Sequence, residues 1–223
     1  MANVLVTGAN RGIGLALVQQ HRARGDAVIG ACRTDNDALR DSGARVESGV
    51  DVTDDVALAA LERRLGEIRI DALWLNAGIL SEESLGGIDA DGFERLRRQF
   101  EVNSLGPLRV AQALLARLGK GSKIGILTSR MGSVEDNGSG GYYGYRASKA
   151  AVNAIGKSLA VDLAPRGIGV YLLHPGYVAT DMVGGHGDIQ PAQAAKRLVA
   201  VLDSRSFEQS GTFWHSNGSA LPW

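Results

Sequence analysis

The alternation of short aliphatic runs with longer segments of helical periodicity constrains the fold of this chain more than any other feature. Seven runs predict strands, at Asn3–Thr7, Ala27–Cys32, Arg45–Gly49, Ala72–Leu75, Lys123–Thr128, Gly169–His174 and Gly211–Phe213. Helical periodicity covers Ile13–Arg24, Asp54–Gly66, Phe93–Leu118, Tyr143–Leu163 and Pro191–Leu202. This order predicts an α/β fold of the Rossmann type, a doubly wound parallel sheet covered by helices on both faces.

Composition restricts the classes of partner. The 223 residues contain no linker, repeat or low-complexity tract, so a single domain over residues 1–223 is expected. Lys plus Arg and Asp plus Glu both number 24, without runs of like charge, which argues against nucleic acid and anionic membranes as partners. The start "MANVLVTGAN" lacks the features of a secretory signal, and no stretch approaches the roughly 18 apolar residues of a membrane span. With Cys32 as the single cysteine, these features predict a soluble cytoplasmic protein.

The turn after the first predicted strand is rich in glycine. In "VLVTGANRGIG", Gly8, Gly12 and Gly14 lie between a strand and the start of a helix. Glycine permits a tight turn and close backbone approach, and a helix N-terminus offers free N–H groups to a pyrophosphate. The turn therefore predicts a dinucleotide site, and the alternative is a tight turn that binds nothing.

The spacing Gly-x-x-x-Gly-x-Gly, with Thr7 ahead of it, resembles the opening of the short-chain dehydrogenase/reductase family, and later motifs agree along almost the whole chain. The resemblance implies a nicotinamide cofactor and no metal. The cofactor contacts that it implies are Gly8, Asn10, Arg11, Gly12, Ile13 and Gly14 in this turn, Asp51 and Val52 in "GVDVTD", Asn76, Ala77 and Gly78 in "LNAG", and Pro175, Gly176, Val178 and Thr180 in "HPGYVATDM". Alternative roles are an N-cap for Asp51 and a sheet-stabilising turn for "LNAG", in which Leu75 replaces an asparagine of the family pattern.

The end of the second strand bears on the choice of cofactor. NAD-binding units carry an acid here that bonds the ribose hydroxyls, whereas this chain has Cys32 followed by Arg33. An arginine can pair with a 2′-phosphate, and Arg11 in the glycine turn could reach the same group. We therefore expect NADP(H). Asp35 is the dissenting residue, because a shift of the strand end could bring its carboxylate to the ribose and favour NAD(H).

"YYGYRASKAAV" contains three tyrosines near one lysine, Lys149. Residues four apart on a helix lie on one face, about 6 Å apart along the axis, and only Tyr145 has this spacing to Lys149. Reduction of a carbonyl needs a proton donor, and a nearby ammonium would lower the pKa of a tyrosine from about 10. The pair matches the family's Tyr-x-x-x-Lys signature, so Tyr145 is predicted to donate the proton. Tyr142 and Tyr143 are left as pocket walls or packing at the helix start.

The resemblance implies two further catalytic residues. Ser129, in "TSRMG" after the fifth strand, is expected to donate to the substrate oxygen, and Ser133 is the competing candidate because loop geometry decides which hydroxyl points inward. Asn103, inside the helix predicted at Phe93–Leu118, matches the asparagine that holds a water in the family's proton relay; a structural asparagine is the alternative. His174, at the end of the sixth strand, is expected to be structural rather than a general acid.

These motifs predict an NADP(H)-dependent oxidoreductase that reduces an aldehyde or ketone. "SGGYYGYRASKAA" and "LPW" look most like carbonyl reductases of the C-factor and sniffer type. The alternatives are an NAD-dependent alcohol dehydrogenase and a non-enzymatic nucleotide-binding regulator. Substrate choice is expected in the loops "LSEESLGG", "SVEDNGSGGYY" and "MVGGHGDIQ", and a homodimer or homotetramer is expected through the long helices Phe93–Leu118 and Tyr143–Leu163.

Overall fold

Seven parallel strands form one sheet in a computed structural model that describes residues 1–223. Their order is β3-β2-β1-β4-β5-β6-β7, so the direction of strand succession reverses between β1 and β4. The strands are β1 Asn3–Thr7, β2 Ala27–Ala31, β3 Arg45–Glu47, β4 Ala72–Leu75, β5 Lys123–Leu127, β6 Gly169–His174 and β7 Thr212–His215. The predicted doubly wound parallel sheet is confirmed, with strand ends that differ from the prediction by at most two residues.

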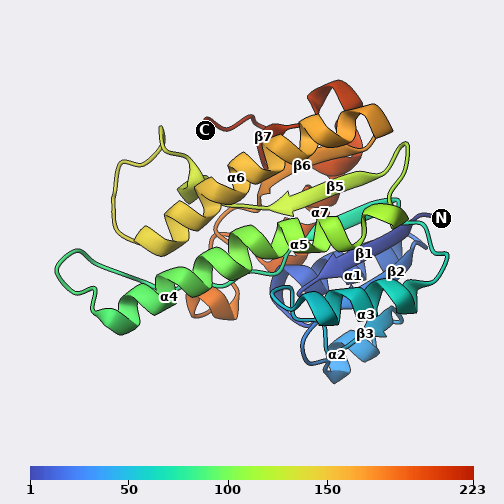
Figure 1. Cartoon of the computed structure of the whole chain (residues 1–223), viewed down its shortest axis with the longest axis horizontal. Coiled ribbons are helices and arrows are strands. Elements are labelled where there is room, and N and C mark those ends of the chain that lie inside the picture. Colours follow the sequence, from blue (N-terminus) through green and yellow to red (C-terminus); the bar gives the residue numbers. More distant parts are fainter.

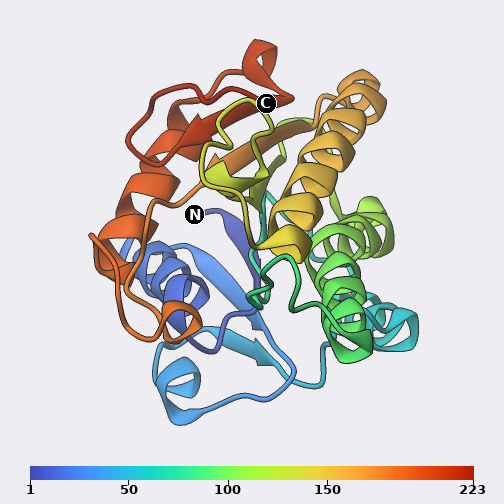
Figure 2. The ribbon, with the colours of Figure 1, turned by 90° about the vertical axis from the view of Figure 1, so that its left-hand side faces the viewer.

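Helices cover both faces of the sheet (Figures 1 and 2). The helices are α1 Gly12–Ala23, α2 Asp37–Arg40, α3 Asp55–Leu65, α4 Ala90–Phe100, α5 Gly106–Ala113, α6 Tyr143–Leu163 and α7 Pro191–Ser204. One face carries α3, α4, α5 and α6, and the other carries α1 packed against α7. Each face of the sheet has its own hydrophobic core, and successive strand residues point into opposite cores. In β1, Leu5 packs on the first face, and Val4 and Val6 pack on the second.

The helix predicted over Phe93–Leu118 is present but begins earlier, at Ala90, and is not uniform. A π-helical turn, Glu101–Leu105, separates α4 from α5, and a 3₁₀ turn, Leu115–Arg117, follows α5. Gly106 N donates to Glu101 O, the wider i→i−5 bond of a π-turn, and Pro107, which has no N–H, follows directly in the first turn of α5. Such π-turns occur often at functional sites, and this one holds Asn103.

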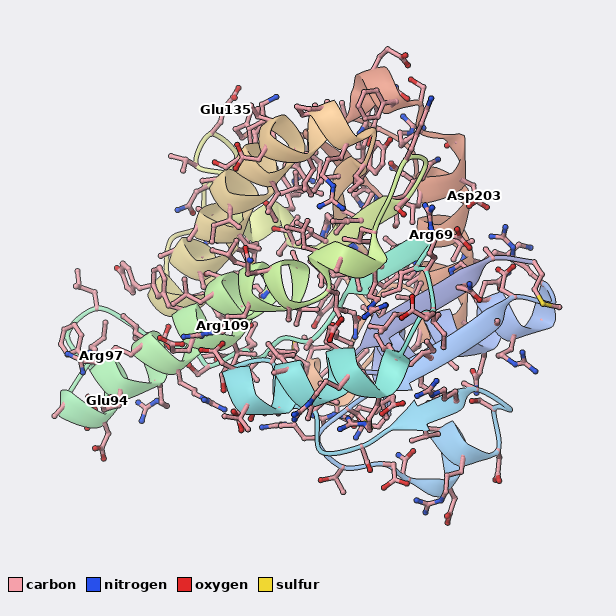
Figure 3. All side chains as sticks on the ribbon, turned by 45° about the vertical axis from the view of Figure 1, so that its right-hand side comes forward. Arg69, Glu94, Arg97, Arg109, Glu135 and Asp203 are labelled. Atoms are coloured by element: carbon pink, nitrogen blue, oxygen red, sulfur yellow. The ribbon has the colours of Figure 1, made fainter.

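Acidic side chains begin two of these helices. Asp54 accepts hydrogen bonds from Val56 N and Ala57 N at the start of α3, and Asp89 accepts one from Gly92 N at the start of α4. On the outer side of α4, Glu94 pairs with Arg97 (Figure 3). None of the helices combines the length and the apolar character needed to cross a membrane.

Candidate active site

One large cavity of about 1300 Å³ runs along the carboxyl ends of the strands. This is the edge where ligands bind in open α/β sheets, beside the switch between β1 and β4. Of the residues predicted from the sequence to bind a cofactor or take part in catalysis, all but Asn103 line it. The fold therefore brings together side chains that are up to about 170 positions apart in the chain, as in the pair Arg11 and Asp181.

The glycine turn between β1 and α1 has the geometry that only glycine allows. Gly8 and Gly12 have φ angles of 65° and 54°, in the left-handed region. A Cβ on Gly14 would lie 2.1 Å from the Gly8 carbonyl oxygen. The absence of a side chain at Gly14 lets the start of α1 pack against Gly8. Gly12, Ile13 and Gly14 line the cavity, so the N-terminus of α1 can present its free N–H groups to an anion there.

Two residues tie this turn to the end of β4. Asn76 Nδ2 donates to Thr7 O at 2.8 Å and to Gly8 O at 3.2 Å, and Thr7 Oγ1 accepts from Asn76 N at 3.0 Å. The alternative of a sheet-stabilising turn is thus an observed role of Asn76, which also lines the cavity. Leu75, which replaces the asparagine of the family pattern, is buried in the core.

Two arginines line the cavity where it passes the end of β2 and the glycine turn. Arg33 and Arg11 both line it, as does Asp181, whose Oδ2 lies 3.4 Å from Arg11 Nη1. Asp35, the dissenting candidate for a ribose contact, does not line the cavity and pairs instead with Arg40. Cys32 is buried beside Arg33, and burial raises the pKa of its thiol. The geometry favours a ligand phosphate here over bare ribose hydroxyls.

Asp51 lies next to this end and is held by its neighbours. Burial by itself would raise its pKa, but hydrogen bonds from Thr53 N and Oγ1, together with the charges of Arg98 and Arg33, outweigh burial and hold that pKa below its ordinary value. The alternative that Asp51 is an N-cap is wrong, because Asp54 caps α3. Arg98, on α4, lines the cavity 3.7 Å from Asp51 Oδ2 and was not predicted, since an arginine on an exposed helix gives no sequence signal.

Tyr145 and Lys149 lie one turn apart on α6 and face the cavity. Lys149 Nζ is 5.7 Å from the centre of the Tyr145 ring and donates to Leu127 O at 2.9 Å. Burial lowers the pKa of Lys149 to about 8. Burial also raises the pKa of Tyr145, although a hydrogen bond with Ser129 opposes it. Burial therefore outweighs the lowering of the Tyr145 pKa that we expected from Lys149.

Asn103 is buried in the π-helical turn rather than at the cavity surface. Its Oδ1 accepts from Ile79 N at 2.8 Å, and its Nδ2 donates to Ile79 O at 2.9 Å and to Ser148 Oγ at 3.0 Å. A Cβ on Gly78 would lie 3.3 Å from Asn103 Oδ1 and 3.7 Å from Lys149 Nζ. Asn103 Oδ1 and Lys149 Nζ therefore both lie on the side of Gly78 to which a Cβ would point, and the hydrogen bonds of Asn103 show the structural role that the sequence left open.

The two candidate serines have different surroundings. Ser129 lines the cavity beside Tyr145, lowers the pKa of that tyrosine, and accepts from Met131 N at 3.1 Å. Ser133 does not line the cavity: its hydroxyl donates to Trp223 O at 3.0 Å and accepts from Asp136 N at 3.1 Å. The geometry favours Ser129 as the donor to a substrate oxygen.

The segment after β6 closes the cavity on the remaining side. Gly176 has a φ of 95°, and the Thr180 methyl group would lie 3.3 Å from a Cβ on Gly12, so this segment meets the glycine turn. His174 Nδ1 is buried without a hydrogen-bond partner. Burial, followed by the neighbouring His215 and the charges of Arg130 and Lys149, lowers the pKa of His174 to about 3, so its imidazole is neutral at ordinary pH. No group of three or more His, Cys, Asp or Glu side chains is arranged to hold a metal ion.

Beyond Tyr145 the cavity opens between the two loops that precede α4 and α6. Tyr142 lines it and donates from its hydroxyl to Glu82 Oε1 at 2.9 Å, whereas Tyr143 lies outside it, half-exposed. Sequence reasoning missed Glu82 and Arg146 in this part of the lining. Glu82 lies in a loop, where no periodicity reveals which way a side chain points, and Arg146 lies in the first turn of α6, where a charged side chain is ordinarily exposed to solvent.

Two known proteins resemble this chain in sequence. It is 44% identical to 1-hydroxy-2-glutathionyl-2-methyl-3-butene dehydrogenase from Rhodococcus sp. (strain AD45), over 100% of both chains. It is also 40% identical to the C-signal protein of Myxococcus xanthus, over 69% of this chain and 93% of that protein.

Solved structures of carbonyl reductases share the fold of this chain. The carbonyl reductase Sniffer of D. melanogaster superposes with a TM-score of 0.90 at 28% identity, over 100% of both chains. An NADPH-bound carbonyl reductase from chicken fatty liver superposes with a TM-score of 0.88 at 28% identity, over 100% of this chain and 99% of that one. The sequence pattern of the short chain dehydrogenase family matches residues 2–190, which include the glycine turn, Ser129, Tyr145 and Lys149. A match of this extent to both the pattern and the fold means that the chain belongs to the short chain dehydrogenase family of oxidoreductases.

Proposed function

We propose that the protein is an NADP(H)-dependent carbonyl reductase that converts an aldehyde or ketone to an alcohol. One observation carries this proposal: Ser129, Tyr145 and Lys149 meet at one end of a cavity whose other end presents Arg11 and Arg33. The NADPH-bound reductase from chicken, similar over the full chain, supports the same cofactor.

The residues present fit this cofactor. The turn of Gly8, Gly12 and Gly14 leaves a backbone cradle that a Cβ would fill, and it would hold the pyrophosphate. Arg11 and Arg33 would hold the 2′-phosphate through charge-assisted hydrogen bonds. Val178 and Thr180 would contact the carboxamide. When bound, the nicotinamide supplies the hydride.

The chain's own residues supply the proton. Ser129 and Tyr145 would donate hydrogen bonds to the substrate oxygen, where negative charge develops during reduction. The raised pKa of Tyr145 keeps its hydroxyl protonated at neutral pH, which is the form that a donor needs. Lys149, whose pKa is about 8, is mostly protonated at neutral pH and would restore the proton to Tyr145, while Asn103 fixes the backbone at Ile79.

The test is Tyr145→Phe, assayed by NADPH absorbance against a panel of small aldehydes, ketones and diketones. We expect kcat to fall by about 10³-fold or more, with NADPH binding within twofold of the wild-type value, because only the proton donor is lost. Tyr143→Phe is the matched control, since this tyrosine is two residues away and lies outside the large cavity. Near-normal turnover by Tyr145→Phe would remove Tyr145 from the mechanism.

Similarity to the Rhodococcus enzyme favours a second candidate, oxidation of an alcohol that carries a glutathione thioether. The same residues would serve, with Tyr145 accepting the proton. Assays with NAD⁺ and NADP⁺ on hydroxy thioethers of glutathione distinguish this activity from carbonyl reduction. Nucleotide binding without turnover in either direction would instead favour the regulator.

A further inference from the structure

We propose that Glu83, in the loop between β4 and α4, is a positioning residue that holds the first turn of α6 and thereby sets the place of Tyr145. The proposal rests on the proposed function, in which Tyr145 is the proton donor. Glu83 lies outside the cavity lining, and nothing in the family match refers to it.

The Glu83 carboxylate is buried, with only 6% of the residue exposed, and no cationic side chain pairs with it. Its Oε1 accepts from Ser81 Oγ at 2.6 Å and from Gln99 Nε2 at 2.7 Å. Its Oε2 accepts from Gly144 N at 3.1 Å, in the first turn of α6. A buried carboxylate without a cation is costly, and the positive end of a 21-residue helix is the group here that offsets its charge.

The start of α6 has no cap of its own. Tyr142, at the N-cap position, makes no side-chain cap hydrogen bond and has φ 51° and ψ 41°, the single non-glycine residue with a positive φ. Its backbone N–H donates to Glu83 O at 3.1 Å. Glu83 therefore holds two successive parts of the helix start, through its carbonyl at Tyr142 and its carboxylate at Gly144, directly before Tyr145.

The third element of this junction is α4. A Cβ on Gly144 would lie 2.4 Å from Gln99 Nε2 and 3.1 Å from Leu96 Cα, so the first turn of α6 packs tightly on α4. Gln99 is fully buried, and its Oε1 accepts from Ser81 N at 3.1 Å, which closes the network. Loss of the carboxylate would leave Gly144 N without its acceptor and Gln99 Nε2 with Ser81 Oγ alone, and would loosen the turn that orients Tyr145.

The first test is Glu83→Ala. We expect kcat for carbonyl reduction to fall by about tenfold or more, because small displacements of a catalytic group are costly, while the NADPH Kd stays within twofold, because the glycine turn is untouched. Hydrogen exchange of the amides in residues 142–148 should become at least about tenfold faster. Asp54→Asn, at the carboxylate that caps α3 far from Tyr145, is the matched control and should change neither kcat nor exchange in that segment.

The decisive variant exchanges the two partners, as Glu83→Gln with Gln99→Glu. In this pair the amide introduced at position 83 can accept from Gly144 N and donate to the carboxylate introduced at position 99, which can still accept from Ser81 N. We expect Glu83→Gln alone to lose kcat and exchange protection, and the double variant to regain most of both. Unchanged kcat and exchange in Glu83→Ala, or no recovery in the exchanged pair, would overturn the proposal. Absence of turnover in the wild-type protein would instead count against the proposed function, and the exchange measurements would still decide whether Glu83 holds the turn.

Discussion

At Tyr145 and Lys149, burial acts on both members of the pair and favours the neutral form of each. It raises the pKa of the tyrosine and lowers that of the lysine to about 8. A tyrosine that keeps its proton at neutral pH is in the form that a proton donor needs. The lysine, near its titration point, can pass a proton on without a large energetic cost.

Arg33 is the residue on which the preference for NADP(H) depends most. We expect Arg33→Asp to weaken NADPH binding by about 10–100-fold, because one charge-assisted contact to the 2′-phosphate is replaced by repulsion, and to strengthen NADH binding. Dissociation constants for both nucleotides, measured by fluorescence titration, check this change.

The control for Arg33 is Arg63→Asp, at an arginine of α3 that does not line the cavity. It should leave both constants within twofold. An NADPH affinity that survives Arg33→Asp would mean that Arg11 and Arg98 hold the phosphate without it.

Some site residues could be predicted because their evidence is local. Tyr145 and Lys149 are four positions apart on one helix, and Gly8, Gly12 and Gly14 share one turn. The sequence around Ser129 and Ser133 could not decide which hydroxyl faces the substrate, because the Ser133 hydroxyl donates to Trp223 O, 90 positions away. The orientation of Lys149 toward Leu127 O likewise depends on a neighbouring strand.

At the scale of elements, two long helices contrast. The bounds of α6, Tyr143–Leu163, match the prediction, because glycines precede the helix and its apolar positions keep one period. The segment Phe93–Leu118 has similar composition but contains an extra residue in the π-turn at Glu101–Leu105. Helical periodicity cannot locate such a turn, because one added residue merely shifts the phase of the apolar positions.

The turn between β1 and α1 should tolerate no side chain at Gly14. A Cβ there would lie 2.1 Å from Gly8 O, so in Gly14→Ala the start of α1 must move away from the cavity. We expect a loss of about 2 kcal/mol or more in the free energy of unfolding, and at least about tenfold weaker NADPH binding. Urea unfolding and nucleotide titration measure the two effects.

Gly25→Ala provides the comparison at the opposite end of α1. Gly25 has a φ of 83° with no atom within 4 Å of an added Cβ. Its replacement should cost about 1 kcal/mol of stability through backbone strain and leave the NADPH Kd unchanged. Equal effects of the two substitutions on binding would show that Gly14 serves only the stability of α1.

At the scale of the whole molecule, the outer face of α4 and α5 carries apolar side chains that no other element covers. Phe93, Phe100, Leu105 and Leu108 are each more than a third exposed. Their spacings of seven, five and three residues keep them on one face, because the step of five spans the π-turn. Val161, on the neighbouring helix α6, is 62% exposed. Single exposed apolar residues are common on protein surfaces, but a row of them on one face is typical of an interaction site. We infer that this row contacts another subunit.

We therefore expect the protein to form a dimer or tetramer through α4, α5 and α6, which light scattering coupled to size-exclusion chromatography would detect as a multiple of 23.4 kDa. Phe93→Lys combined with Val161→Lys should weaken the association by about 2 kcal/mol or more, because two apolar side chains are replaced by charges that must be desolvated. Val56→Lys, at an exposed valine on α3, should leave the mass unchanged. A wild-type mass of one chain at micromolar concentration would show that this apolar row stays exposed to solvent.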